Sequence, residues 1–168
     1  SLTMVAGKGL VVATGATYNP GGTITFSGTS RLVVRGVVTL GGTFTPGTLT
    51  YEQTAGTFTN STFAASFSTA TISGGTFTAG SGTVTIPTLS LSGSGTFTVT
   101  TGTFTNATSV TMTGGFFNGG SAATNTIPLL TLSGTGVFNQ ATGATSNTVT
   151  TLTMSGGTYN GRTAANAF

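Results

Sequence analysis

Side chains that could carry acid–base, nucleophilic or metal chemistry are almost absent from this sequence. Its 168 residues include a single acidic residue, Glu52, and no histidine or cysteine. General acid–base catalysis needs a positioned titratable pair, and glycoside hydrolysis needs two carboxylates. The abundant Ser and Thr hydroxyls have no base to activate them. We therefore predict that the chain is not an enzyme and that it binds no metal and no cofactor.

The few charged residues do not form a recognisable binding motif. Lys8, Arg31, Arg35 and Arg162 give a net charge of +3 together with Glu52. They are scattered, whereas a phosphate backbone is bound by a clustered basic patch. Glu52 could pair with Arg31 or Arg35 one repeat earlier, but the favoured interpretation is an exposed solubilising charge, because surface ion pairs contribute little. We expect no nucleic-acid partner and, since apolar stretches are short, no membrane span.

The overall composition favours β structure. Only 3% of the residues are charged, whereas 36% are hydrophobic and 28 are glycine. Disordered chains have few aromatic and β-branched residues, but this sequence has 12 Phe, 3 Tyr and much Thr and Val. The elements that position any functional group are therefore expected to be strands.

Two columns of apolar residues recur about every 20 residues. The first column is aliphatic, and each member is followed by a second apolar residue two positions later. Its members are Leu10, Leu32, Leu49, Ala70, Leu89, Val110, Leu130 and Leu152. The second column is mostly aromatic and follows the first, usually after a Gly. Its members are Tyr18, Val38, Phe58, Phe77, Phe97, Phe117, Phe138 and Tyr159.

The columns alternate small polar with apolar residues, as strands with one buried face do. A looser third column includes Ile24, Phe44 and Phe104. We predict an all-β, single-domain parallel β-solenoid over residues 1–168, right-handed, with three strands in each coil of about 20 residues and about eight coils. Rungs ~4.8 Å apart would make a rod of roughly 38 Å, with the aromatic column stacked inside.

Pairs of threonines flank several aromatic positions and would face outward. They are Thr57 and Thr59, Thr76 and Thr78, and Thr96 and Thr98. One hypothesis is that these rows form an ice-binding grid of hydroxyl and methyl groups. The favoured alternative is that Thr is an uncharged strand former suited to an outward position.

The amino-acid sequences of individual repeats resemble those of a known class of protein. Residues 89–98 read LSLSGSGTFT, residues 132–139 read LSGTGVFN and residues 154–160 read MSGGTYN. These resemble the repeats of bacterial autotransporter passengers and filamentous-haemagglutinin-like adhesins, which are secreted parallel β-helices. The resemblance implies an extracellular or cell-surface structural protein, part of a filament or adhesin, with glycans or host or abiotic surfaces as possible partners.

Copies of the chain itself are the expected main partner. The ends of a solenoid expose backbone donors and acceptors together with an apolar cross-section. Leu2 and Met4 alternate like a strand, and counting by coil length places Met4 and Phe168 in the third column. We predict head-to-tail polymerisation through Leu2, Met4 and Phe168, with little charge to oppose it.

Overall fold

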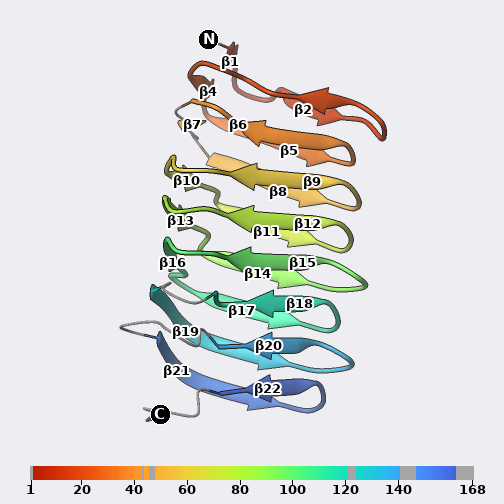
Figure 1. Cartoon of the computed structure of the whole chain (residues 1–168), viewed down its shortest axis with the longest axis vertical. Helices are drawn as coiled ribbons and strands as arrows, with labels where there is room; N and C mark the ends of the chain where they lie inside the picture. The colour runs from red at the N-terminus through yellow and green to blue at the C-terminus, as the bar shows by residue number, and fades with distance from the viewer. Residues whose placement is uncertain (1, 43, 46–47, 121–123, 141–146, 162–168) are drawn as a thin grey trace.

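The strands of the chain lie side by side in parallel and form a stack of coils with β1 (Leu2–Met4) at one end and β22 (Thr158–Asn160) at the other (Figure 1). The structure is a computed structural model that describes residues 2–42, 44–45, 48–120, 124–140 and 147–161. Within these ranges there is no helix, and every strand pair is parallel. The predicted parallel β-solenoid is thus confirmed.

One side of the stack, here called the aromatic face, is an eight-stranded sheet. It repeats one strand per coil, so seven turns separate its first strand from its last. Its strands are β3 (Thr17–Tyr18), β6 (Val37–Leu40), β9 (Thr57–Asn60), β12 (Thr76–Ala79), β15 (Thr96–Val99), β18 (Phe116–Asn118), β20 (Val137–Asn139) and β22 (Thr158–Asn160).

The second side, the aliphatic face, carries the first apolar column. It consists of β2 (Gly9–Val12), β5 (Thr29–Val34), β8 (Thr48–Gln53), β11 (Thr69–Ile72), β14 (Thr88–Leu91), β17 (Ser109–Met112) and the C-terminal halves of β19 (Thr124–Leu132) and β21 (Asn147–Met154).

The third face closes each coil. It contains β1 (Leu2–Met4), β4 (Ile24–Phe26), β7 (Phe44–Thr45), β10 (Ala65–Ser66), β13 (Thr83–Thr85), β16 (Thr103–Thr105) and the N-terminal halves of β19 and β21. The two long strands bend around the corner, because β19 pairs with β16 through its first residues and with β17 through its last.

The core is a stack of like residues inside the coils. In β12 and β15 every second side chain is buried, so Phe77 and Phe97 point inward while the threonines between them point outward. The ring centroids of Phe77 and Phe97 lie 5.0 Å apart, and those of Phe97 and Phe117 lie 5.3 Å apart. Such separations are favourable for aromatic pairs.

The ladder continues in both directions with the same spacing. Phe58 stacks on Phe77 with a centroid separation of 4.6 Å, and Phe117 stacks on Phe138 at 4.6 Å. Tyr159 lies parallel to Phe138 at 5.5 Å. Val38 separates Tyr18 from Phe58 in this column, so the first tyrosine lies outside the continuous ring stack.

The aliphatic column differs from the predicted one at a single rung. Tyr51, and not Leu49, lies opposite Leu32, while Leu49 lies opposite Ser30. The reason is coil length: Leu32 to Leu49 is too short to close a turn, whereas Leu32 to Tyr51 matches the neighbouring coils. Leu49 is nevertheless fully buried. The other predicted members, Leu10, Leu32, Leu89, Val110, Leu130 and Leu152, occupy equivalent positions in successive strands.

Glycine is required where the chain turns from the aliphatic to the aromatic face. Gly75 has φ of 76°, and a Cβ atom there would lie 2.4 Å from the carbonyl oxygen of Gly56 in the preceding coil. Such a contact is far closer than real Cβ atoms allow. Glycine therefore permits both the left-handed backbone and the close stacking of corners.

Phe97→Ala should lower the free energy of unfolding by about 3–5 kcal/mol, because it opens a cavity between Phe77, Phe104 and Phe117. Phe116→Ala is the matched control, since the Phe116 side chain lies on the outside of the same sheet with 47% exposure. Denaturant titrations followed by circular dichroism compare the two variants. Equal losses of stability would contradict the inward ladder.

Candidate functional site

The outward side of the aromatic face presents the predicted threonines in register. Thr57, Thr76 and Thr96 lie opposite one another on consecutive strands, and so do Thr59, Thr78 and Thr98. Adjacent strands in a sheet are about 4.8 Å apart. The two columns therefore form a regular grid, three rungs long, that carries hydroxyl and methyl groups.

The grid ends where other residue types replace the threonines. On the N-terminal side Val37 takes the place of the first threonine, and on the C-terminal side Phe116 does so. Both side chains are exposed. On the same C-terminal side, Asn118 takes the place of the threonine in the second column, opposite Thr98.

Hydroxyl columns of the same kind cover the other two faces, which the sequence analysis did not predict. On the aliphatic face Thr69 and Thr71 are in register with Thr88 and Ser90, and these with Ser109 and Thr111. On the third face Thr83 and Thr85 are in register with Thr103 and Thr105, and these with Thr124 and Thr126. The middle of the stack is therefore covered by short hydroxyl side chains on every face.

An asparagine ladder continues the second threonine column toward the C-terminus. The Nδ2 of Asn139 donates to the Oδ1 of Asn118 at 2.7 Å, and the Nδ2 of Asn160 donates to the Oδ1 of Asn139 at 2.7 Å. The Nδ2 of Asn118 in turn lies 3.5 Å from the Oγ1 of Thr98. The spacing of these asparagines in the sequence could have revealed the ladder.

The residues predicted to join copies end to end lie on the terminal rungs where they are described. Leu2 and Met4 belong to β1, pair with Ile24 and Phe26 and are partly buried against the core. Phe168 lies outside the described residues. At the other end Met154 is 47% exposed, and Leu152 and Tyr159 are partly buried.

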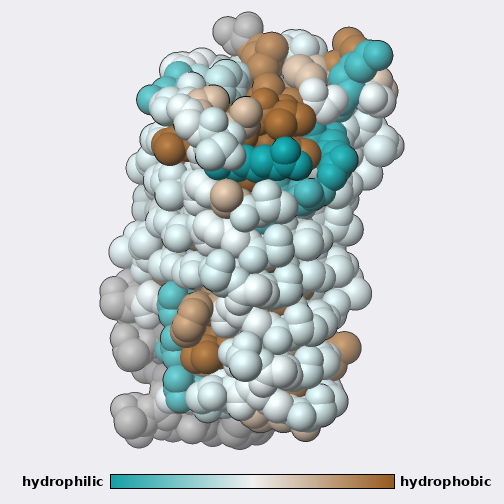
Figure 2. Space-filling view, turned by 90° about the vertical axis from the view of Figure 1, so that its right-hand side faces the viewer, coloured by the Kyte–Doolittle hydropathy of each residue, from teal (hydrophilic) through white to brown (hydrophobic). Residues whose placement is uncertain are grey.

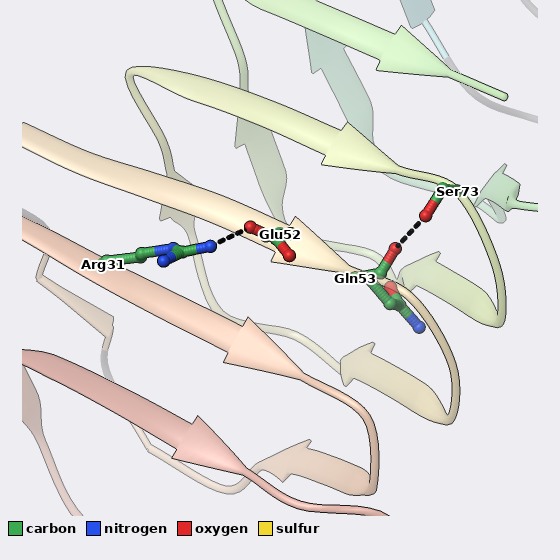
Figure 3. A network of polar contacts seen from close by, with 4 residues as sticks. All are labelled: Arg31, Glu52, Gln53 and Ser73. Carbon is green, nitrogen blue, oxygen red and sulfur yellow. Dashed lines mark hydrogen bonds and ion pairs between the residues drawn. The ribbon is translucent and has the colours of Figure 1, made fainter.

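Glu52 forms an ion pair with Arg31 one coil earlier (Figure 3). Of the two interpretations, the pairing with Arg31 is thus the one observed, and not an exposed charge alone. Arg31 lies opposite Thr50 and Glu52 lies opposite Val33, so their side chains are diagonal neighbours on one side of the sheet. Both remain partly exposed, at 58% for Arg31 and 29% for Glu52, and an exposed pair contributes only about 0–1 kcal/mol.

Gln53, which the sequence analysis missed, forms a polar network inside the corner after β8. Its Nε2 donates to the carbonyl oxygens of Gly56 and Thr76, both at 3.1 Å. Its Oε1 accepts a hydrogen bond of 2.8 Å from the hydroxyl of Tyr51. The Oγ of Ser73 lies 3.5 Å from the backbone oxygen of Gln53 (Figure 3). The buried amide is thus satisfied, and it ties two coils together.

A shallow hollow of about 510 Å³ lies on the aliphatic face near the N-terminus. It forms where Gly9 supplies no side chain in the outward column that continues with Arg31 and Thr50. Lys8 and Arg31 stand beside it, and Val11, which is 58% exposed, forms an apolar part of its wall. In Figure 2 the larger group of hydrophobic (brown) and hydrophilic (teal) residues lies toward this end of the molecule and a smaller group lies toward the other end, whereas the middle of the stack is pale.

The described residues present polar columns along the sides of the stack and strand edges at its ends. No group of three or more acidic, histidine or cysteine side chains occurs among them. None of them belongs to a helix long and apolar enough to cross a membrane. What the arrangement can do chemically is pair backbone edges at its ends and present hydroxyl and amide groups along its sides.

Stability should fall at alkaline pH because of Tyr51. Complete burial raises the pKa of the Tyr51 hydroxyl well above its ordinary value of 10. The folded chain therefore keeps a proton that the unfolded chain loses above pH ~10, so the free energy of unfolding should decrease there by up to about 1.4 kcal/mol per pH unit.

Tyr51→Phe tests this origin. The variant should unfold more easily at neutral pH by about 1–3 kcal/mol, because the Oε1 of Gln53 loses its donor, but its stability should depend less on pH above 10. Tyr159→Phe is the control, since Tyr159 is only partly buried. Unfolding titrations at several pH values would refute the account if both variants kept the pH dependence of the original chain.

Comparison with protein-family models, with curated proteins and with solved structures found no match to this chain.

Proposed function

We propose that the chain is a structural segment of an extracellular filament or adhesin and that its coils stack end to end onto those of further copies. The observation that carries the proposal is the uninterrupted parallel register of the aromatic face over its eight strands. A stack built by adding identical rungs presents, at each end, an edge that can accept another rung.

The terminal strands have the features that such growth needs. Strands β3 and β22 are the two edges of the aromatic sheet, and β2 is an edge of the aliphatic sheet. An unpaired strand edge is a template for pairing with another chain. Partly buried apolar side chains accompany these edges, namely Leu2, Met4, Leu10 and Tyr18 at one end and Leu152 and Tyr159 at the other. Stacking would complete their burial.

The sides of the rod support a passive, exposed role. Short hydroxyl groups cover the middle coils on each face, and the low charge of the chain gives little repulsion between ends. The likeness of the repeats to secreted adhesins supports an extracellular location. Hydroxyl and amide columns are also suited to hydrogen bonding with glycans or with abiotic surfaces.

Ice binding is the second candidate, and the in-register threonine grid on β9, β12 and β15 favours it. Two observations favour the structural role instead. The grid is interrupted by Val37 and Phe116, and similar hydroxyl columns occur on the other two faces. This distribution is expected if Thr and Ser serve as uncharged strand residues.

Filaments should form at sufficient protein concentration, with an axial repeat of about 38 Å that corresponds to eight rungs of ~4.8 Å. Met4→Lys should weaken assembly strongly, because it places a charge among the apolar side chains of the terminal rung. Val5→Lys is the control, since Val5 is already 59% exposed. Electron microscopy and light scattering report the outcome. A chain that stays monomeric, or filaments indifferent to Met4→Lys, would contradict the proposal.

Solutions of the chain should show no thermal hysteresis beyond the colligative value and should not shape ice crystals. Ice shaping that is lost in Thr76→Lys but kept in Thr71→Lys would reverse the ranking of the two functions. Thr71 is a suitable control because it is an outward threonine on the aliphatic face, away from the grid.

A further inference from the structure

The first and last rungs of the aromatic face have the same three-residue sequence, with Asn19 directly following strand β3 (Thr17–Tyr18). Thr17, Tyr18 and Asn19 occupy the first rung, and Thr158, Tyr159 and Asn160 occupy the last. In both, the tyrosine is the partly buried inward residue and its neighbours are exposed. The two edges of this sheet therefore present the same pattern of side chains.

The asparagine ladder that ends at Asn160 has a direction. At each step the Nδ2 of one asparagine donates to the Oδ1 of the asparagine in the preceding coil. Among the residues that the structure describes, no donor is bonded to the Oδ1 of Asn160. The last rung thus offers an acceptor that is equivalent to those already used by Asn139 and Asn160.

Asn19 stands at the other end of the same column. Tyr18 pairs with Val38, and the amide of Gly41 donates to the carbonyl oxygen of Pro20 at 3.1 Å, so the same register continues past β3 and places Asn19 beside Thr39. From Thr39 the column leads through Thr59, Thr78 and Thr98 to the ladder. Pro20 follows Asn19 and favours an extended backbone there. The exposed amide of Asn19 is therefore placed at the open edge of the first rung.

We infer that strand β22 of one copy docks in parallel against strand β3 of a second copy, with Asn160 opposite Asn19 and the Nδ2 of Asn19 donating to the Oδ1 of Asn160. This inference rests on the proposed end-to-end assembly and adds its register and polarity. The contact repeats two interactions already present, the Asn139–Asn160 hydrogen bond of 2.7 Å and the parallel pairing of β20 with β22.

The paired triplets exclude the alternative contacts. A slip of one residue would turn tyrosine toward solvent and bring threonine or asparagine into the core. A tail-to-tail contact would set two Asn160 Oδ1 acceptors against each other. Only the head-to-tail arrangement keeps the strands parallel and the direction of the amide hydrogen bonds unchanged.

Replacing both asparagines by residues of like charge tests the contact. One variant carries Asn19→Asp with Asn160→Asp, and the other carries Asn19→Lys with Asn160→Lys. Each variant alone places like charges opposite each other, so the concentration needed for filaments should rise by at least about tenfold. An equimolar mixture should restore assembly, with the two variants alternating along the filament.

The controls carry the same charges away from the edges. Thr71→Asp with Thr78→Asp, and the corresponding lysine pair, lie on different faces in the middle of the stack and should assemble alone. Circular dichroism checks that each variant is folded.

If the original chain forms filaments and the charged asparagine variants also do so unmixed, the inferred contact is overturned while end-to-end assembly stands. If an equimolar mixture of the aspartate and lysine variants forms no filaments, the inferred contact is overturned as well. If the original chain is monomeric, the assembly itself is overturned.

Discussion

The parallel hydrogen bonding of each rung to the preceding rung is the constraint on which the whole structure depends. The amide nitrogens of Thr57, Thr76 and Thr96 each donate to the carbonyl oxygen of a glycine in the coil before, at 2.9–3.0 Å. This repetition fixes the rise per coil. It also fixes which side chains meet, so inward residues stack on inward residues and the core becomes a set of columns.

The polar residues inside the coils follow from the same constraint. At the corners, buried amide side chains donate to backbone carbonyl oxygens, some of which also accept a backbone hydrogen bond. Asn106 is an example, since its Nδ2 lies 2.7–2.9 Å from the carbonyl oxygens of Ile86, Pro87 and Ser109, which share its two hydrogens. Gln53 does the same at another corner. The outward asparagines differ, because they bond to one another and not to the backbone.

Much of the fold could be predicted from sequence because a solenoid repeats one simple pattern. The spacing of Phe77, Phe97 and Phe117 predicted consecutive strands, and these strands pair in that register. Leu49 was misaligned because local alternation cannot show which of two apolar positions closes a coil of variable length. The pairing of Glu52 was not favoured because it depends on a diagonal neighbour in the adjacent strand β5, one coil earlier. The tripeptide at residues 17–19 gained meaning only when the register placed it in the same column as residues 158–160.

Hydrogen exchange at Thr17 tests the end-to-end account most directly. The residues equivalent to Thr17 in later rungs each donate their amide to the preceding coil, as Val37 does to Ala16 at 2.9 Å. In an isolated copy the amide of Thr17 faces the open edge of β3 and should exchange quickly. On assembly it should become protected, while the amides of β12 and β15 in the middle of the stack should change little. Fast exchange of Thr17 in dilute and concentrated samples alike would contradict the account.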